Sequence, residues 1–297
     1  MKIIVTGSLG HIGKPLTEEL VQKGQKVTVI SSEPDRQKDI EALGATAAIG
    51  SVEDVGFLDA TFRGADAVYT MIPPHDFFDQ SHDLMARYRR IGNNFLQAIS
   101  QSDIKRVVHL SSVGAHLDQG AGIVLGHHAV EDILNQLNDV AITFMRPTAF
   151  YTNLYNFSES IKATGKIMSN YGADDIVPWV SPKDIAAAIV EELVTLLVGR
   201  KIRYVASEEL TCNKVAGILG AAIGKPDLQW ALIPGEQLKT GMESFGMNTQ
   251  IAAGLVEMQS AMHTGVFFED YYLNRPTLGK VKLTEFAKEF ATAFSNK

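Results

Sequence analysis

The sequence lacks features that several classes of protein require. Its 297 residues contain one cysteine, Cys212, which rules out an internal disulfide and a cysteine-rich metal site. No run of about 18 apolar residues is free of charge, so we expect no membrane-spanning helix and no membrane partner. The start, MKIIVTGS, lacks the apolar core of a secretory signal. We therefore expect a globular protein of the reducing cytoplasm.

Positive charge is not in excess either. There are 27 Lys and Arg against 34 Asp and Glu, which gives a net charge of −7. A protein that binds a phosphate backbone needs the opposite sign, so we expect no nucleic-acid partner. The 8 histidines form neither an HExxH motif nor a dense cluster, so we expect no metal. A small-molecule substrate is the remaining kind of partner, and a homodimer stays open.

The first part of the chain alternates short apolar runs with longer amphipathic stretches. The runs are rich in β-branched residues, which is typical of strands buried on both faces of a parallel sheet. We expect strands at 3–5, 27–30, 46–49, 67–72, 107–110 and 142–145, and helices at about 12–23, 54–62 and 77–102. This alternation predicts right-handed βαβ crossovers and an α/β fold with a doubly wound parallel sheet.

The pattern changes after residue 146. Residues 147–180 carry aromatic and polar residues with turn signals and show no clear hydrophobic period. Residues 183–197 then predict a helix and 202–206 a strand, and both are expected to rejoin the sheet. Further helices are expected at 211–223, 248–263 and 283–294. We therefore expect a Rossmann domain of residues 1–146 plus about 181–207. A smaller, interleaved C-terminal lobe would comprise about 147–180 and 208–297.

A glycine-rich turn joins the first expected strand to the first expected helix. Residues 6–13 read TGSLGHIG, with glycines at 7, 10 and 13. In a dinucleotide-binding turn, the first glycine allows the tight bend, the second allows close approach of a pyrophosphate, and the third allows the helix to pack on the strand. The helix N-terminus then offers N–H groups to phosphates. The expected contacts are Gly7, Ser8, Leu9, Gly10, His11, Ile12 and Gly13.

At this point the chain resembles the NmrA-like family of atypical short-chain dehydrogenases. The resemblance rests on TGSLGHIG, on MRPTAFYTNL at 145–154, on VSPKDIAAAIV at 180–190 and on LTCNKVAGILGAAIGKP at 210–226. It implies an NAD(P)-binding Rossmann fold. It also implies membership of a group that includes type-2 quinone oxidoreductases and non-catalytic redox-sensing regulators.

The end of the second strand bears on the choice of cofactor. Ser31 and Ser32 stand where an acid or the family's arginine is usual, and Arg36 follows. Two hydroxyls and a cation suit a 2′-phosphate, so NADP(H) is favoured. Glu33 could instead hold the ribose of NAD(H), which stays possible. Alternatively, these charged residues only begin the next helix. Ser51 departs from the family's aspartate near the adenine.

The nicotinamide half is expected at the carboxyl ends of the later strands, where ligands bind in doubly wound sheets. The residues predicted to contact it are Met71, Ile72, Pro73, Ser111, His127, Pro147 and Phe150.

The usual catalytic pair of short-chain dehydrogenases is missing. Counting from Glu131, the lysine position holds His127 and the tyrosine position holds Ile123. This disfavours alcohol dehydrogenase and sugar epimerase chemistry. Because His127 and Glu131 are four residues apart on a helix, two interpretations remain. Either His127 reaches the cofactor with its tautomer fixed by Glu131, or the two form a local hydrogen bond.

An aromatic segment follows the sixth strand. We expect Phe150, Tyr151, Asn153, Tyr155 and Phe157 to form a lid, with core packing as the alternative. His127, Tyr151 and Asn153 are the candidate catalytic residues. The leading hypothesis is an NADPH-dependent reductase that transfers hydride to a quinone or a similar small carbonyl-type acceptor. The alternatives are a non-catalytic NAD(P)-binding redox sensor and, less favoured, a nucleotide-sugar epimerase or dehydratase.

Overall fold

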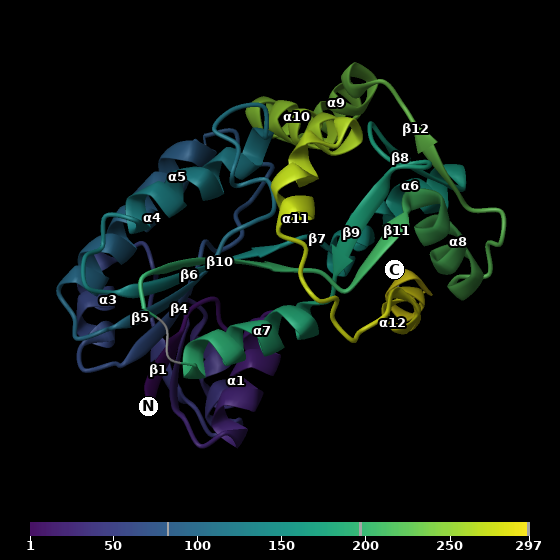
Figure 1. Ribbon diagram of the computed structural model, residues 1–297. Helices are drawn as coiled ribbons and strands as arrows, with labels where there is room; N and C mark the ends of the chain where they lie inside the picture. The colour runs from purple at the N-terminus through teal and green to yellow at the C-terminus, as the bar shows by residue number, and fades with distance from the viewer. Residues whose placement is uncertain (82, 196–197, 296–297) are drawn as a thin grey trace.

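A parallel sheet of seven strands forms the centre of the molecule (Figure 1). The computed structural model describes residues 1–81, 83–195 and 198–295. The strands are β1 (Lys2–Val5), β2 (Lys26–Ser31), β3 (Thr46–Ile49), β4 (Ala67–Met71), β5 (Arg106–Leu110), β6 (Ala141–Pro147) and β10 (Arg200–Val205). Their order is β10-β6-β5-β4-β1-β2-β3, and every pairing is parallel. The predicted doubly wound sheet is confirmed, and the strand predicted at 202–206 does rejoin it as β10.

Helices cover both faces of this sheet (Figure 1). One face carries α1 (Gly13–Gln22) and α7 (Pro182–Val194), while the other carries α3 (Val55–Phe62), α4 (Leu84–Ser100) and α5 (Leu125–Leu134). Each layer buries its own apolar core against the strands. The sheet reverses its order between β1 and β4, which in such folds places a ligand crevice at their carboxyl ends.

The helix expected at about 77–102 begins later than predicted. Side chains in the preceding segment form local turns, because Asp76 accepts a hydrogen bond from the backbone N–H of Phe78 and Asp79 accepts one from that of Ser81. Such side-chain contacts compete with helical hydrogen bonds. Asp83 then caps α4 by accepting from the Ala86 N–H at 2.9 Å. The expected helix 183–197 ends at 194, and positions 196–197 lie outside the described residues.

The rest of the chain forms a smaller lobe beside the carboxyl ends of the sheet (Figure 1). Its short strands are β7 (Ala149–Phe150), β8 (Lys166–Ser169), β9 (Ile176–Val180), β11 (Glu208–Thr211) and β12 (Gln229–Leu232). Its helices are α6 (Ser158–Thr164), α8 (Cys212–Ala222), α9 (Gly235–Ser244), α10 (Thr249–Thr264), α11 (Glu269–Leu273) and α12 (Leu283–Ser295). The 3₁₀ helices of the molecule are η1 (Pro34–Arg36), η2 (Gly122–Val124), η3 (Tyr151–Phe157) and η4 (Val266–Phe268), and α2 spans Gln37–Ala42. The strands of this lobe lack the continuous apolar runs of the central sheet, because β8 begins with Lys166 and ends with Ser169, and Pro178 interrupts β9. For this reason 147–180 gave no strand prediction.

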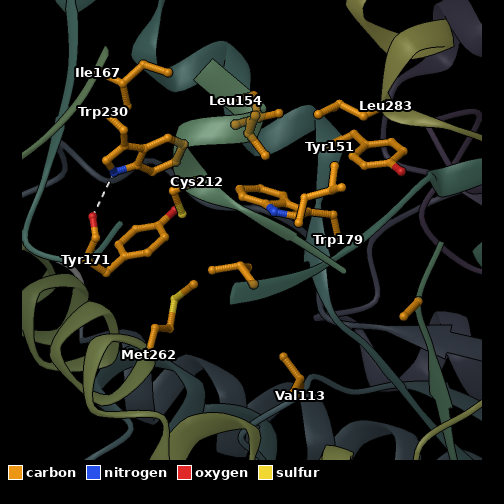
Figure 2. Packing of buried hydrophobic residues seen from close by; sticks show 14 of the residues in the cluster. Val113, Tyr151, Leu154, Ile167, Tyr171, Trp179, Cys212, Trp230, Met262 and Leu283 are labelled. Carbon is orange, nitrogen blue, oxygen red and sulfur yellow. Dashed lines mark hydrogen bonds between the residues drawn. The ribbon is translucent and has the colours of Figure 1, made fainter. Parts of the chain in front are cut away.

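Aromatic side chains fill the core of the lobe (Figure 2). Trp179 and Trp230 are buried, and their ring centroids lie 6.3 Å apart. The Trp230 indole donates a hydrogen bond to the backbone oxygen of Tyr171 at 2.7 Å. Both tryptophans are thus part of the packed core of the lobe.

Asp184 fastens the lobe to the sheet layer. It lies in the segment VSPKDIAAAIV, near the start of α7, and accepts a hydrogen bond from the Ser207 hydroxyl at 2.6 Å. It also accepts from the backbone N–H groups of Lys280 and Val281, on the segment that leads into α12. This acid therefore holds the C-terminal segment against the Rossmann layer.

Among the described residues, no helix is long and apolar enough to cross a membrane.

Candidate functional site

The glycine-rich turn lies at the carboxyl end of β1, beside the point where the strand order reverses. Gly7 has φ +88°, and a Cβ there would lie 2.8 Å from the sulfur of Met71. A Cβ on Gly13 would lie 2.0 Å from the carbonyl oxygen of Ser8. A Cβ on Gly10 would be 3.6 Å from its nearest described neighbour, the Gly7 oxygen. Gly7 and Gly13 are therefore required by the fold itself, whereas Gly10 has room for a Cβ.

The first turn of α1 is suited to an anion. Ile12 stands at the N-cap position, and no described side chain caps the helix there. The Ile12 side chain is buried, and Leu9 packs against the same core, so the backbone of this turn faces outward. Uncapped N–H groups and the helix dipole together favour a phosphate at this place. The His11 side chain is exposed beside it.

The candidates for the ribose side have different positions. Ser31 is buried, and its hydroxyl contacts that of Ser8 at 3.0 Å and the backbone N–H of Glu33 at 3.2 Å, so it braces the turn. Ser32 is exposed. Arg36 donates to the Glu33 carboxylate at 3.0 Å. The two residues that argued for different cofactors are therefore paired with each other.

The carboxyl ends of the next strands bring several predicted residues to one edge. Met71 ends β4 against Gly7, and Ile72 is buried while Pro73 is half-buried. Ser111 directly follows β5, and Pro147 ends β6. Phe150, on β7, packs at the border of the core that also receives Leu9 and Met71. These residues form the edge expected to receive a nicotinamide.

Glu131 has partners that the sequence did not indicate. It accepts a hydrogen bond from the Ser111 hydroxyl at 2.5 Å and is bound by Arg146 through two nitrogens, at 2.9 and 2.6 Å. Arg146 also reaches Asp270 of α11 at 3.2 Å, and Tyr204 contacts both Arg146 and Asp270. Because its two oxygens are engaged by Ser111 and Arg146, Glu131 neither fixes the tautomer of His127 nor forms the local hydrogen bond with it, so that part of both interpretations is wrong. The expectation that His127 reaches the cofactor stays a prediction.

His127 is a residue of α5, and its ring lies against Tyr88 of α4. Its Nε2 is 3.4 Å from the Tyr88 hydroxyl, the two rings meet edge to face, and its buried Nδ1 has no hydrogen-bond partner among the described residues. Burial lowers the pKa of His127 to about 4. A second histidine, His109 of β5, is fully buried, and its Nδ1 lies 2.9 Å from the Thr70 hydroxyl. Burial, together with the charge of His127, lowers the pKa of His109 to about 3. Sequence reasoning missed His109, which sits inside an apolar strand.

The expected aromatic lid divides between several places. Tyr151 is fully buried in the lobe core (Figure 2), where its hydroxyl donates to Glu208 at 3.0 Å. Burial and the Glu208 carboxylate raise the pKa of the Tyr151 phenol, so it stays protonated. The side chain of Asn153 is exposed. Because η3 turns the chain after Phe150, neighbouring side chains point in different directions. This placement favours a packing role for Tyr151 and leaves Phe150 at the cofactor edge.

The segment after β4 reaches across to the lobe. The backbone N–H of Asn248 donates to the Phe77 oxygen at 2.9 Å, and its side-chain amide donates to the Asp79 oxygen at 3.1 Å. The same side chain caps α10 by accepting from the N–H groups of residues 250 and 251. Asn248 thus joins the nicotinamide-side loop to the start of α10, a role without a sequence signal.

In the part of the chain that the structure describes, no group of three His, Cys, Asp or Glu could hold a metal.

Comparisons with known proteins agree with this geometry. A family model described as the NmrA-like family matches residues 1–286. The chain is 25% identical to the NAD(P)H azoreductase of Xenophilus azovorans, over 98% of this chain and 99% of that protein. The triphenylmethane reductase of Citrobacter sp. has a similar structure, with a TM-score of 0.80, 19% identity, and coverage of 98% of this chain and 100% of that one. The NADPH-dependent quinone oxidoreductase QOR2 of Escherichia coli, in complex with NADPH, has a TM-score of 0.80 at 18% identity, covering 97% and 99% of the two chains.

Proposed function

The chain belongs to the NmrA-like family, and on that basis we propose that it is an NADPH-dependent reductase of a quinone or a similar small carbonyl-type acceptor. The observation that carries the proposal is the open face of Gly10 at the uncapped first turn of α1. A fold that only needed a tight turn would not require a free backbone surface there. A pyrophosphate would use it.

The chemistry needs little from side chains. Bound NADPH would supply a hydride, and the protein would bind and orient it. Met71 and Phe150 offer apolar surface at the nicotinamide edge. Ile123 takes the place of a phenol, Glu131 is held by Arg146, and His127 is neutral above about pH 4. These side chains suit hydride transfer in which water supplies the proton, and they do not suit alcohol oxidation by an ionised phenol.

NADP(H) is proposed over NAD(H) because Ser32 and Arg36 are both exposed at the end of β2. A 2′-phosphate could compete with Glu33 for the Arg36 guanidinium, since a phosphate is a strong acceptor for arginine. The quinone oxidoreductase of similar structure, which is complexed with NADPH, supports this choice, and the name of the NAD(P)H azoreductase is compatible with either cofactor.

A redox sensor is the second candidate, and one contact favours it. Asp270 links the buried pair of Glu131 and Arg146 to α11, whose last residue, Leu273, is 84% exposed. A change at the cofactor edge could therefore reach a surface helix through Ser111.

Oxidation of NADPH in the presence of a panel of quinones separates the two candidates. We expect steady loss of reduced nicotinamide absorbance with at least one quinone, and no loss without an acceptor. Calorimetric binding of NADPH without turnover on any acceptor would contradict the reductase and support the sensor. Gly10→Val serves as the matched control without a cofactor site.

A further inference from the structure

Two loops form one wall of the proposed cofactor cleft. One follows β3 and contains Ser51 and Glu53, on the side where adenine is expected. The other follows β4 and begins at Pro73, on the side where nicotinamide is expected. In the sheet, β3 and β4 are separated by β2 and β1, so these loops are not neighbours through strand pairing.

Arg87 of α4 bridges these two loops. Its side chain is 8% exposed, its Nε donates to Glu53 Oε1 at 3.0 Å, and its Nη1 donates to the Pro73 backbone oxygen at 2.8 Å. One rigid guanidinium therefore fixes a carboxylate from one loop and a carbonyl from the other. The Arg87 side chain is buried, whereas the Glu53 side chain is 36% exposed, so the pair is better shielded from water than an ion pair with both partners on the surface.

Two further α4 residues hold the adenine-side loop alone. Arg90 donates to the other Glu53 oxygen at 2.6 Å, and Asn94 donates to the backbone oxygens of Val52 and Glu53 at 3.2 and 3.0 Å. The hydrogen bond from Arg90 lowers the pKa of the Glu53 carboxyl, against the opposing effect of burial. Arg90 thus shares one partner with Arg87 but does not contact Pro73, which makes it a matched control.

We propose that Arg87 is a positioning residue that sets the spacing between the adenine and nicotinamide ends of the cleft; the inference rests on the proposed function. The glycine turn fixes the pyrophosphate, and the two ends of the cofactor must then meet loops at a defined separation. Preformed loops spare the cofactor the cost of ordering them.

The test compares Arg87→Met with Arg90→Met, each measured for binding of NADPH and of 2′,5′-ADP, which carries only the adenine half. Both variants lose one Glu53 contact and should weaken 2′,5′-ADP equally. Only Arg87→Met frees Pro73, so it alone should weaken NADPH further, by about tenfold relative to 2′,5′-ADP, because the freed loop must then be ordered when the nicotinamide end binds. A general loss of structure would not change the ratio of the two dissociation constants.

An equal ratio in the two variants would overturn the proposal. If Arg87→Met shows no folded state in thermal unfolding, Arg87→Lys replaces it, because an ammonium does not reproduce the fixed spacing of the Nε and Nη1 donors that reach the two loops, and the same ratio decides. The assay uses binding alone, so a wild-type protein that binds NADPH without turning over leaves the inference intact while the reductase fails. Wild-type protein that binds 2′,5′-ADP no more weakly than NADPH would also contradict the inference, since the nicotinamide end would then contribute nothing.

Discussion

At the scale of single residues, three glycines in one turn carry different constraints. Gly7 and Gly13 have no room for a Cβ, because Met71 and the Ser8 carbonyl oxygen occupy that space. Gly10 has room, and the space lies where a pyrophosphate is proposed. The same residue type is thus required by the backbone at two positions and by a ligand at the third.

Gly10→Val should therefore abolish dinucleotide binding without unfolding the protein. Its side chain would enter the pyrophosphate path rather than the core. Gly13→Val is the contrast, because its Cβ would clash with Ser8 and should lower the unfolding temperature. Calorimetry with NADPH and thermal unfolding measure the two effects. Unchanged NADPH affinity in Gly10→Val would mean that the turn is not the phosphate site.

Arg36 gives a second prediction at this scale. NADPH should bind more tightly than NADH, and Arg36→Ala should narrow the gap by roughly tenfold, because a charged contact to a phosphate is worth on the order of 1.5–3 kcal/mol. Glu33→Gln removes the nearer of the two carboxylates that pair with Arg36, the other being Asp39 at 3.7 Å, and should widen the gap between the two affinities. Dissociation constants of the four protein and cofactor combinations test this. Tighter binding of NADH by the wild type would assign Glu33 to the ribose instead.

His127 should contribute little as an acid. A true general acid is typically worth about 10²–10⁴-fold in kcat. With its pKa lowered to about 4, His127 is not protonated at neutral pH, and its ring faces Tyr88 and His109. We expect His127→Ala to lower kcat by less than about threefold and to leave the pH profile flat near neutrality. A large loss of rate with a lost pH dependence would restore His127 as a proton donor.

At the scale of elements, one buried ionic group joins four of them. Glu131 of α5, Arg146 of β6, Tyr204 of β10 and Asp270 of α11 meet behind Ser111. The Arg146 and Glu131 side chains are 5% and 8% exposed, so each charge depends on the other for compensation. This group fixes the end of β5 relative to the lobe.

Glu131→Gln should destabilise the fold by about 3–5 kcal/mol, because it leaves the Arg146 charge buried with a weaker partner. Asp270→Asn removes a partner that is 29% exposed and should cost markedly less. Urea unfolding of the two variants gives both free energies. Equal and small losses would show that the pair of Glu131 and Arg146 is not the dominant interaction.

At the scale of the whole molecule, neutral buried histidines make stability depend on acid. His109 and His127 have folded-state pKa values of about 3 and 4, below the ordinary value of 6.5. At a pH between the lowered pKa and 6.5, each of these histidines is protonated in the unfolded chain and neutral in the folded one. The free energy of unfolding therefore falls as the pH drops below about 6.5. Above that pH neither group contributes any further change.

The unfolding temperature should accordingly be lower at about pH 5 than at neutral pH. His109→Leu removes one of these titrating groups and places an apolar side chain in the buried strand. The difference in unfolding temperature between the two pH values should therefore shrink. Thermal unfolding of both proteins at the two pH values measures this. A difference that is the same in His109→Leu would mean that other groups set the acid sensitivity.

Local patterns in the sequence were enough for the sheet and for its glycine turn. Apolar β-branched runs predicted the strands because a strand buried on both faces needs them, and TGSLGHIG predicted the turn because its backbone demands glycine. The predicted start of the helix at about residue 77 was wrong, because Asp76 and Asp79 form side-chain turns before α4, and a search for hydrophobic periodicity does not detect such turns. The strands of the lobe left no such pattern because they lack a continuous apolar run: β8 mixes polar and apolar residues, and Pro178 interrupts β9.

The sequence by itself determined the doubly wound fold and the place of the glycine-rich turn, because both depend on residues that are neighbours in the chain. Only the tertiary structure decided which partner each polar side chain takes. Glu131 bonds Arg146 rather than His127, Tyr151 bonds Glu208, and Arg87 bonds Glu53 and Pro73. These partners lie between 14 and 57 positions apart. Such pairs are selected by the packing of whole elements, since a buried polar group must find whichever partner the fold brings within reach.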